Sequence, residues 1–261
     1  MRNMTERDEQ MNQIRKGIYT SPTSGLAHGY AQANLVVLPK KDAYDFLLFC
    51  QRNKQACPLL DVTDVGSAVP KIIGANADIR TDLPRYRVYR YGVLTEERTD
   101  INSLWEDDMV GFLIGCSFTF EDALIANNIP IRHQQEKVNV PMYETSIPCE
   151  AAGIFYGNVV VSMRPVSEEQ AVRASLVTAR FPSVHGAPIH IGNPAAIGIT
   201  NIHKPDFGDQ VTIKEGEVPV FWACGVTPQA VAMASKPALM ITHAPGHMFI
   251  TEIKNEQLGV L

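Results

Sequence analysis

The chain has 261 residues, of which 45% are hydrophobic and 20% charged, and its formal net charge is −5. This composition is typical of a globular protein, and the excess of acidic residues gives no general attraction to nucleic acid. No run approaches the ~20 apolar residues that span a bilayer, and the charged start lacks a signal-peptide core. We therefore expect a cytoplasmic protein with no membrane or nucleic-acid partner, built as one large α/β domain or two packed subdomains.

The cysteines are odd in number and form no C-x-x-C pair, which is typical of a reduced cytosolic protein. This pattern argues against a disulfide framework or a structural zinc site. Cys50 falls on the apolar side of a helix-like stretch and is predicted to be buried and inert. The five cysteines are Cys50, Cys57, Cys116, Cys149 and Cys224.

The first part of the chain opens in an α/β style. Residues 5–17 predict a charged helix, and the apolar residues 34–39 predict a short buried strand that leads into a helix over 40–53. Turn-forming residues crowd the segment 61–84, which predicts a loop-rich region. The alternating sequence of 85–94 suggests an exposed ribbon rather than a core strand.

Two strand–turn–helix units follow in the middle of the chain. The continuous apolar run 109–116 is typical of a strand buried on both faces, and it passes directly into a helix-like segment at 117–127. A second run, 154–163, leads through Arg164-Pro165 to a helix over 167–181. Ser167 and Gln170 have the spacing of a capping box at the start of that helix.

The last part repeats the arrangement. Residues 218–225 predict a strand that leads into a helix, with Thr227 as its N-cap and Pro228 at its first position. Two further strands are predicted at 238–243 and 247–253. Nothing in the sequence separates independent domains by a linker or a repeat.

In open α/β sheets, ligands bind beyond the carboxyl ends of the strands, where the next helix presents unpaired N–H groups. This rule selects residues 115–119, 223–227 and 242–247. If the three strands are near neighbours and point the same way, two cysteines, two histidines and two helix N-termini meet at one edge. We expect the ligand site there.

Several side chains at these strand ends have two interpretations. A helix N-terminus favours the thiolate of Cys116, and Ser117 and Thr119 add hydroxyl donors beside it, although structural burial is the favoured role. Cys224, next to Gly225, is expected to be buried or to line the pocket. Glu121, in the first turn of its helix, either complements the helix dipole or faces the pocket.

Histidines provide further candidates. The Gly- and Pro-rich loop 184–198 carries His185, His190 and Asn193, the composition of a rigid loop that holds side chains near a ligand. His243 and His247 are four residues apart, but Pro245 and Gly246 between them exclude a helical pair of metal ligands. Hydrogen-bonded histidines are therefore favoured over a metal site.

Arginines are candidates for holding a substrate carboxylate. The planar guanidinium groups of Arg132 and Arg164 are suited to bidentate pairing with such a group. A structural ion pair is the alternative for either residue.

Sequence blocks along almost the whole chain resemble, in order, the family of D-glutamate cyclase and the bacterial hydro-lyases. The resemblance predicts one family unit over residues 1–261, and it departs at Asn193, where the family more often has Asp. The blocks are PTSGLAHGYAQANLVVLP (22–39), FCQRNKQACPLL (49–60), DIRTDLPRYRVYR (78–90), GFLIGCSFTFEDAL (111–124), VVSMRP (160–165), FPSVHGAPIHIGNP (181–194), PDFGD (205–209), PVFWACGVTPQ (219–229) and ITHAPGHM (241–248).

The resemblance implies a three-layer α/β main region with a smaller α+β subdomain, within about residues 120–200. It also implies reversible loss of water between D-glutamate and 5-oxo-D-proline, or a hydro-lyase reaction on another small carboxylate or amino acid. No cofactor is required, but Mn²⁺ or Mg²⁺ could polarise the carboxyl group. The alternative is a binding module or sensor for 5-oxoproline or a related acid. A homo-oligomer is expected on general grounds.

For such a ring closure, proton transfer is assigned to His243, His247 and His185, with Glu121 orienting one of them. Backbone N–H groups at 116–117 and 225–226 would hold the oxyanion, and Arg132 or Arg164 would hold the unreacted carboxylate. In a covalent variant Cys116 attacks the acyl carbon.

Overall fold

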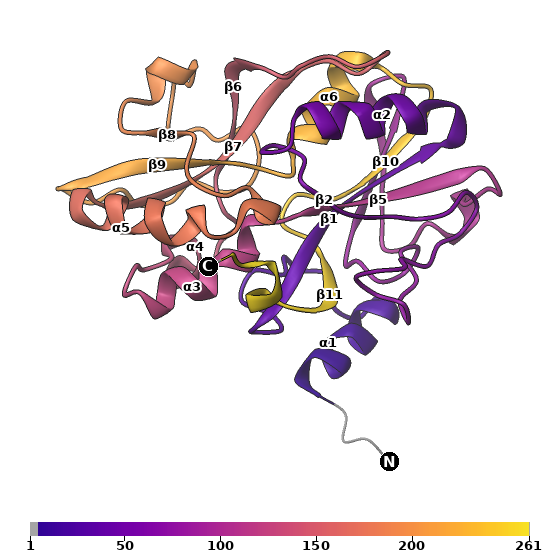
Figure 1. The fold of residues 1–261 in the computed structure, drawn as a ribbon, viewed down its shortest axis with the longest axis horizontal. Coiled ribbons are helices and arrows are strands. Elements are labelled where there is room, and N and C mark those ends of the chain that lie inside the picture. The colour runs from indigo at the N-terminus through magenta and orange to yellow at the C-terminus, as the bar shows by residue number, and fades with distance from the viewer. Residues whose placement is uncertain (1–4, 261) are drawn as a thin grey trace.

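The structure, a computed structural model, describes residues 5–260 and confirms the predicted mixed α/β class. Strands form a seven-stranded and a four-stranded sheet, and every pairing is antiparallel. In Figure 1, β9 and helix α5 lie to the left of the strands of the larger sheet, and α2 lies over one side of that sheet. The antiparallel pairing differs from the open parallel sheet on which the strand-end rule was based.

The larger sheet is centred on β1, which pairs with β5 on one side and with both β10 and β11 on the other. This central position explains why the interior residues of β1 are buried on both faces. The strand order is β2-β5-β1-β10-β3-β4. The strands are β1 (Tyr30–Pro39), β2 (Leu59–Val62), β3 (Tyr86–Arg90), β4 (Val93–Arg98), β5 (Met109–Gly115), β10 (Met240–His243) and β11 (Phe249–Lys254).

The smaller sheet has the order β6-β7-β9-β8, from β6 (Met142–Pro148), β7 (Asn158–Ser167), β9 (Glu217–Ala223) and β8 (His190–Ile191). Its residues span 142–223, a segment that overlaps the expected subdomain of about 120–200 and runs past its end. β7 continues through Arg164-Pro165, where the sequence predicted a connection. It does so because β9 pairs with it as far as Ser167.

Apart from α4, which was not predicted, the helices of the described residues fall within the predicted segments. No helix within residues 5–260 is long and apolar enough to cross a membrane. The capping box of α5 is confirmed: the Ser167 hydroxyl accepts the Gln170 N–H at 3.2 Å, and the Gln170 side chain accepts the Ser167 N–H. The helices are α1 (Glu6–Arg15), α2 (Lys40–Arg52), α3 (Glu121–Ala126), α4 (Arg132–Glu136), α5 (Glu168–Ala179) and α6 (Thr227–Ser235). Short 3₁₀ turns precede α3 (Ser117–Phe120) and cover Asn102–Leu104, Pro182–Val184, Pro194–Ile197 and Asn255–Leu258.

Two local predictions were wrong. Thr227 is the first residue of α6 and Val226 is its N-cap, because the Thr227 hydroxyl donates to the Cys224 carbonyl and ties this turn to β7. Residues 85–94 are not an exposed ribbon throughout. β3 lies between β10 and β4 with Tyr86 and Val88 in the core, and only β4 is an exposed edge.

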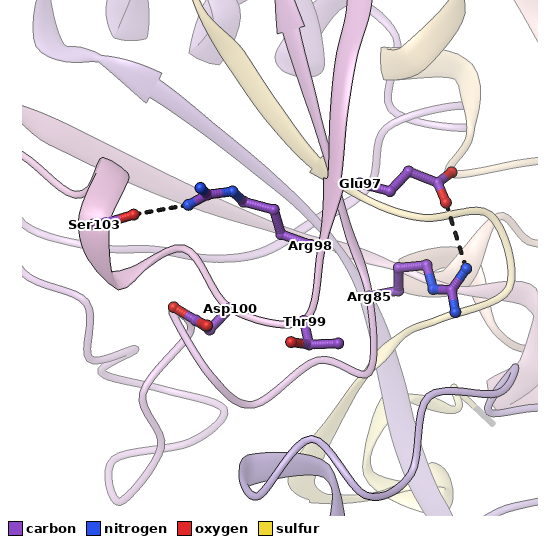
Figure 2. A pocket seen from close by; sticks show the side chains of 6 residues that line it. All are labelled: Arg85, Glu97, Arg98, Thr99, Asp100 and Ser103. Carbon is purple, nitrogen blue, oxygen red and sulfur yellow. Dashed lines mark hydrogen bonds and ion pairs between the residues drawn. The ribbon is translucent and has the colours of Figure 1, made fainter.

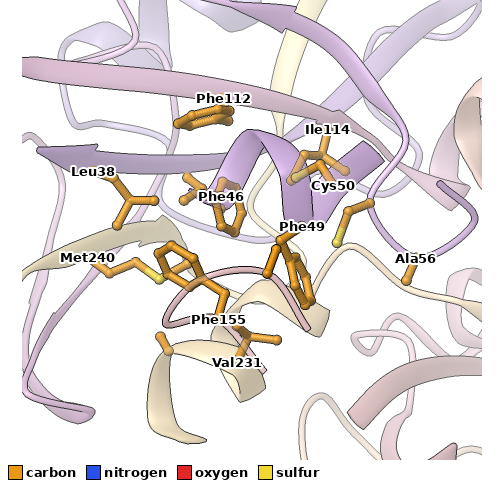
Figure 3. Close-up of a cluster of buried hydrophobic side chains, with 14 of the residues drawn as sticks. Leu38, Phe46, Phe49, Cys50, Ala56, Phe112, Ile114, Phe155, Val231 and Met240 are labelled. Carbon is orange, nitrogen blue, oxygen red and sulfur yellow. The ribbon is translucent and has the colours of Figure 1, made fainter. Parts of the chain in front are cut away.

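One face of the larger sheet is covered by α2. Phe46 lies with its ring centroid 4.9 Å from that of Phe112 and 5.2 Å from that of Phe155, both edge to face (Figure 3). Cys50 is buried in the same cluster, as predicted. The opposite face is covered by the loop-rich segment after β2, whose Ile79 packs among the β1 side chains, and this segment is confirmed as irregular.

Candidate functional site

The three strand ends selected from the sequence lie close together even though the sheets are antiparallel. β5 and β10 point the same way because each runs antiparallel to β1. The Asn34 amide of β1 donates to the Gly115 carbonyl at 2.7 Å, at the end of β5. A Cβ added to Gly225, after β9, would lie 1.9 Å from the same amide nitrogen. Gly225 therefore permits the close approach of the smaller sheet to β1.

Cys116 and Cys224 lie in one buried cluster at this junction. The Cys116 sulfur accepts the Phe118 N–H at 3.4 Å. Burial raises the pKa of the Cys116 thiol well above its ordinary value, and it raises the pKa of Cys224 to about 11. Both thiols are therefore protonated near neutral pH, a state that favours the structural role over that of a nucleophile.

Next to the cysteines lies a buried ion pair. Glu121, the first residue of α3, and Arg164, in the middle of β7, have side chains that are 2% and 1% exposed. Both the Nε and an Nη of Arg164 bond to Glu121 Oε1, with Nε at 3.1 Å. Two further guanidinium donors bond to the hydroxyls of Ser162 and Ser117, each at 3.1 Å. Four of the five N–H groups of Arg164 are thus bonded inside the protein.

Three side chains complete the coordination of Glu121 from the other side. Gln134 Nε2 donates to Glu121 Oε2 at 2.7 Å, and Ser24 Oγ donates to the same oxygen at 3.1 Å. His133 Nε2 lies 3.3 Å from Glu121 Oε1 and 3.1 Å from Ser24 Oγ. We call the six residues Ser24, Ser117, Glu121, His133, Gln134 and Arg164 the ionic network.

The charge state of Glu121 follows from these partners. Burial by itself would raise the pKa of Glu121, but the neighbouring His133 and Arg164 and their hydrogen bonds outweigh burial. They lower the pKa to about 2. Glu121 is therefore ionised at neutral pH and serves to fix its neighbours rather than to accept a proton.

A cavity of about 640 Å³ lies above the ionic network. Ser24, His133 and Gln134 form part of its wall, and all three also contact Glu121. These side chains therefore connect the buried ion pair to the cavity. Its other charged or titratable lining groups are His28, Lys137 and Asp209, and it is completed by Ser21, Pro22, Gly25, Val138 and Asn139. A small acid could therefore meet the ammonium group of Lys137 and the hydroxyl of Ser21 in one place.

Arg132 lies in a different environment from Arg164. It pairs with Glu217 and donates to the Thr212 carbonyl at 2.6 Å, and it does not line the cavity. With a side chain only 5% exposed, Arg132 fixes α4 against the segment before β9, as in the structural alternative.

The three histidines assigned to proton transfer lie apart from the ionic network. His243 is buried with Nδ1 3.3 Å from the Leu35 backbone, and burial lowers its pKa to about 3. His185 has φ +85° and its Nδ1 lies 2.8 Å from the Gln55 carbonyl, and burial lowers its pKa to about 4. Within residues 5–260, Nε2 of each has no hydrogen-bond partner.

His247 contacts backbone carbonyls with both ring nitrogens, at 2.9 Å from Pro245 O and 3.2 Å from Thr20 O. Burial lowers its pKa. The side chain therefore joins the β10–β11 turn to the segment before β1.

The remaining candidates bond to other protein groups, His190 and Asn193 within their own loop and Thr119 to β1. His190 Nε2 lies 2.7 Å from the Asn193 carbonyl, and the Asn193 side chain caps the following 3₁₀ turn through the Ala195 N–H. Thr119 Oγ1 accepts the Gln32 N–H at 3.0 Å. Within the described part of the chain, no group of three or more His, Cys, Asp or Glu side chains could hold a metal ion.

Sequence reasoning identified Glu121, Arg164 and Ser117 but missed Ser24, His133 and Gln134. Ser24 falls within one of the blocks that resemble the family, which was the available signal for it. His133 and Gln134 lie between two such blocks, and a lone His-Gln pair on a short helix has no distinctive pattern.

These features define a mixed α/β protein with a buried carboxylate–guanidinium–imidazole centre beside a cavity. A family profile described as D-glutamate cyclase matches residues 110–252, more than half of the chain. A "Putative hydro-lyase" of Bacillus licheniformis is 68% identical over 97% of both chains. Proteins with the same name from Geobacillus kaustophilus and Bacillus subtilis are 67% and 66% identical, and the alignments cover 97% and 95% of this chain and 96% of each relative. The chain belongs to the D-glutamate cyclase family.

Proposed function

We propose that this chain is a hydro-lyase that interconverts D-glutamate and 5-oxo-D-proline in the cavity above the ionic network. Membership of the D-glutamate cyclase family supports the reaction class. The observation that carries the proposal is the position of His133, held between the ionised Glu121 and the Ser24 hydroxyl at the cavity wall. An imidazole in that position can act as a general acid or base towards a bound substrate.

The reaction requires proton movement but no external proton. The α-ammonium of D-glutamate loses a proton, and its nitrogen attacks the side-chain carboxyl carbon to form a tetrahedral intermediate. The nitrogen then loses a second proton as the C–O bond breaks. Both protons leave with the departing oxygen as water, so one group that takes a proton from nitrogen and returns it to oxygen is sufficient.

We assign that shuttle to His133. Glu121 is a positioning residue that orients the imidazole and balances the positive charge that the imidazole gains on protonation. Gln134 and Ser24 support this arrangement, because Gln134 Nε2 donates to Ser24 Oγ and both side chains donate to Glu121 Oε2. His243 and His185 are less suitable because they are buried away from the cavity with lowered pKa values, and both nitrogens of His247 contact backbone carbonyls.

The unreacted carboxylate would be held by the ammonium group of Lys137, which lines the cavity. His28 lines the cavity too, but its Nδ1 lies 3.2 Å from Asp122 Oδ1. Arg164 and Arg132, the arginines first considered for this role, already have carboxylate partners inside the protein. Lys137 follows α4 in the left-handed conformation (φ +57°), so its backbone position is fixed next to His133.

Proton NMR time courses of the purified protein with D-glutamate and, separately, 5-oxo-D-proline test the reaction. The L-enantiomers serve as controls, and parallel series with a chelator and with added Mn²⁺ test the metal-dependent form. Enantioselective interconversion is expected. Absence of turnover in every series would reject the cyclase and favour the binding-module alternative.

His133→Asn should lower turnover by roughly 10²-fold or more, the usual contribution of a general acid–base group. His203→Asn is the matched control, because His203 is exposed and does not line the cavity. Turnover by His133→Asn within threefold of the unsubstituted protein would show that His133 is not the proton-transfer group.

A further inference from the structure

A second cavity, of about 390 Å³, lies on the other side of the β10–β11 turn. Asn139 lines both cavities and donates to the Pro245 carbonyl at 3.0 Å, so this residue and the turn form the partition. The second cavity also shares Arg85 and Glu97 with the hollow drawn in Figure 2. None of the six residues of the ionic network lines it.

Arg85 and Arg87 form one wall of the second cavity. Side chains two residues apart in an extended chain point to the same side, while Tyr86 between them is buried in the core behind β3. Both arginines use the same carboxylate: Glu97 accepts Arg87 Nε at 2.8 Å and Arg85 Nη1 at 3.4 Å (Figure 2 shows the second bond). Two guanidinium groups thus share one counter-charge.

Most of the donors on these two side chains are free to bind a ligand. A guanidinium carries five N–H groups. Glu97 accepts a hydrogen bond from each arginine, and the Tyr89 hydroxyl also interacts with Arg87. The side chains of Arg85 and Arg87 are 40% and 23% exposed, so they are accessible but partly shielded from water. A planar anion such as a carboxylate would satisfy them with paired hydrogen bonds.

The second cavity also contains a negative charge. Asp206 lines it and accepts the Glu144 N–H through Oδ2 at 2.8 Å, with Phe207 next to it. His247 lines the cavity too, but both of its nitrogens contact backbone carbonyls and leave no donor for a ligand. The carboxylate of Asp206 disfavours a multiply charged anion such as phosphate and suits an ammonium group.

We propose that this second cavity binds a small amino acid as its zwitterion, with the carboxylate on Arg85 and Arg87 and the ammonium on Asp206. The site is distinct from the cavity in which the cyclase reaction is placed. It provides a separate point at which an amino acid can be held without being converted.

Isothermal titration with D- and L-norvaline tests this site, because norvaline lacks a side-chain carboxyl group and cannot cyclise. Pentanoate, which is norvaline without the ammonium group, and inorganic phosphate are the comparison ligands. We expect at least one norvaline enantiomer to bind at least tenfold more tightly than pentanoate. Equal affinity for pentanoate, tighter binding of phosphate, or no binding of either enantiomer would overturn the proposal.

Variants locate the binding. Arg87→Gln should weaken norvaline binding by roughly tenfold or more, and Asp206→Asn should remove the preference for norvaline over pentanoate. Arg90→Gln, at the exposed end of β3 and outside the cavity, is the matched control and should bind as the unsubstituted protein does. Unchanged binding by Arg87→Gln would overturn the proposal, and so would loss of binding in His133→Asn, which would place norvaline in the first cavity. Norvaline binding needs no turnover, so the titration tests the second cavity whether or not the protein interconverts D-glutamate and 5-oxo-D-proline.

Discussion

Two buried centres of the molecule differ in what holds them together. Under α2, phenyl rings and aliphatic side chains pack against the larger sheet without any charged group (Figure 3). Around Glu121 and Arg164, two charges that are 1–2% exposed are surrounded by hydrogen-bond donors and by the rings of Phe120 and Trp222, each with its centroid 5.4 Å from the guanidinium carbon. The first centre gains stability from the area it buries, whereas the second must pair its charges to offset the cost of burying them.

The comparison teaches that the two centres should respond differently to substitution. An apolar side chain in the first centre contributes in proportion to what is removed. In the second centre, removing one charge leaves its partner buried and unpaired, which costs more than removing both charges together. The stability of the protein should therefore be more sensitive to a single substitution in the ionic network than to one in the cluster under α2.

The largest effect is expected from Glu121→Gln, which should lower the free energy of unfolding by up to about 5 kcal/mol because Arg164 is left without a counter-charge. The double variant Glu121→Gln with Arg164→Met should recover most of this loss. Urea unfolding followed by circular dichroism measures both values. If the double variant is less stable than the single one, the unpaired charge is not the cause of the loss.

Phe46→Ala should lower the free energy of unfolding by about 3–4 kcal/mol, because it leaves a cavity between Phe112 and Phe155. Phe46→Leu, the matched control, should cost less than about 1.5 kcal/mol if the neighbours repack around it. The same unfolding measurement applies. A loss below about 1 kcal/mol for Phe46→Ala would show that the cluster collapses readily and would weaken the contrast with the ionic network.

The sequence predicted some elements of the fold correctly and others wrongly. Continuous apolar runs and a capping box correctly gave β5, β9 and α5, since these signals are local. β3 was misjudged because its arginines hid the alternate Tyr86 and Val88 that face the core.

The candidate site was predicted only in part, for a related reason. Glu121 and Arg164 could be named from their residue types and positions, but their pairing joins residues 43 apart in the sequence. His133 meets Ser24 across 109 residues, a contact that no local pattern specifies. The β1-centred topology that brings the strand ends together also depends on long-range pairing rather than on any one motif.

A smaller expected effect is that the stability contributed by Glu121 depends on pH, whereas that of the cluster under α2 does not. The pKa of Glu121 is lowered from 4.5 to about 2 in the fold. Between these values the unfolded chain takes up a proton that the folded protein does not, so the stabilisation from this group is present above pH 4.5 and is lost as pH falls towards 2. This loss amounts to about 3 kcal/mol.

The destabilisation caused by Glu121→Gln should therefore shrink between pH 5 and pH 3, while that caused by Phe46→Ala stays constant, because the residues of the cluster under α2 include no carboxyl or imidazole group. Each variant is compared with the unsubstituted protein at the same pH, which cancels the general effect of the buried histidines His185 and His243. Parallel pH dependence of the two variants would contradict the lowered pKa of Glu121.

The central position of β1 also affects how the chain reaches its fold. Val36 pairs with Thr242, which lies 206 residues later (242 minus 36), and Gln32 pairs with Ile250. During synthesis β1 emerges early, yet its β10 and β11 edge can be covered only after more than 200 further residues have been made. Contacts of such high sequence separation slow folding and leave a strand edge exposed in the meantime. The nascent chain is thus most prone to aggregation before β10 and β11 emerge.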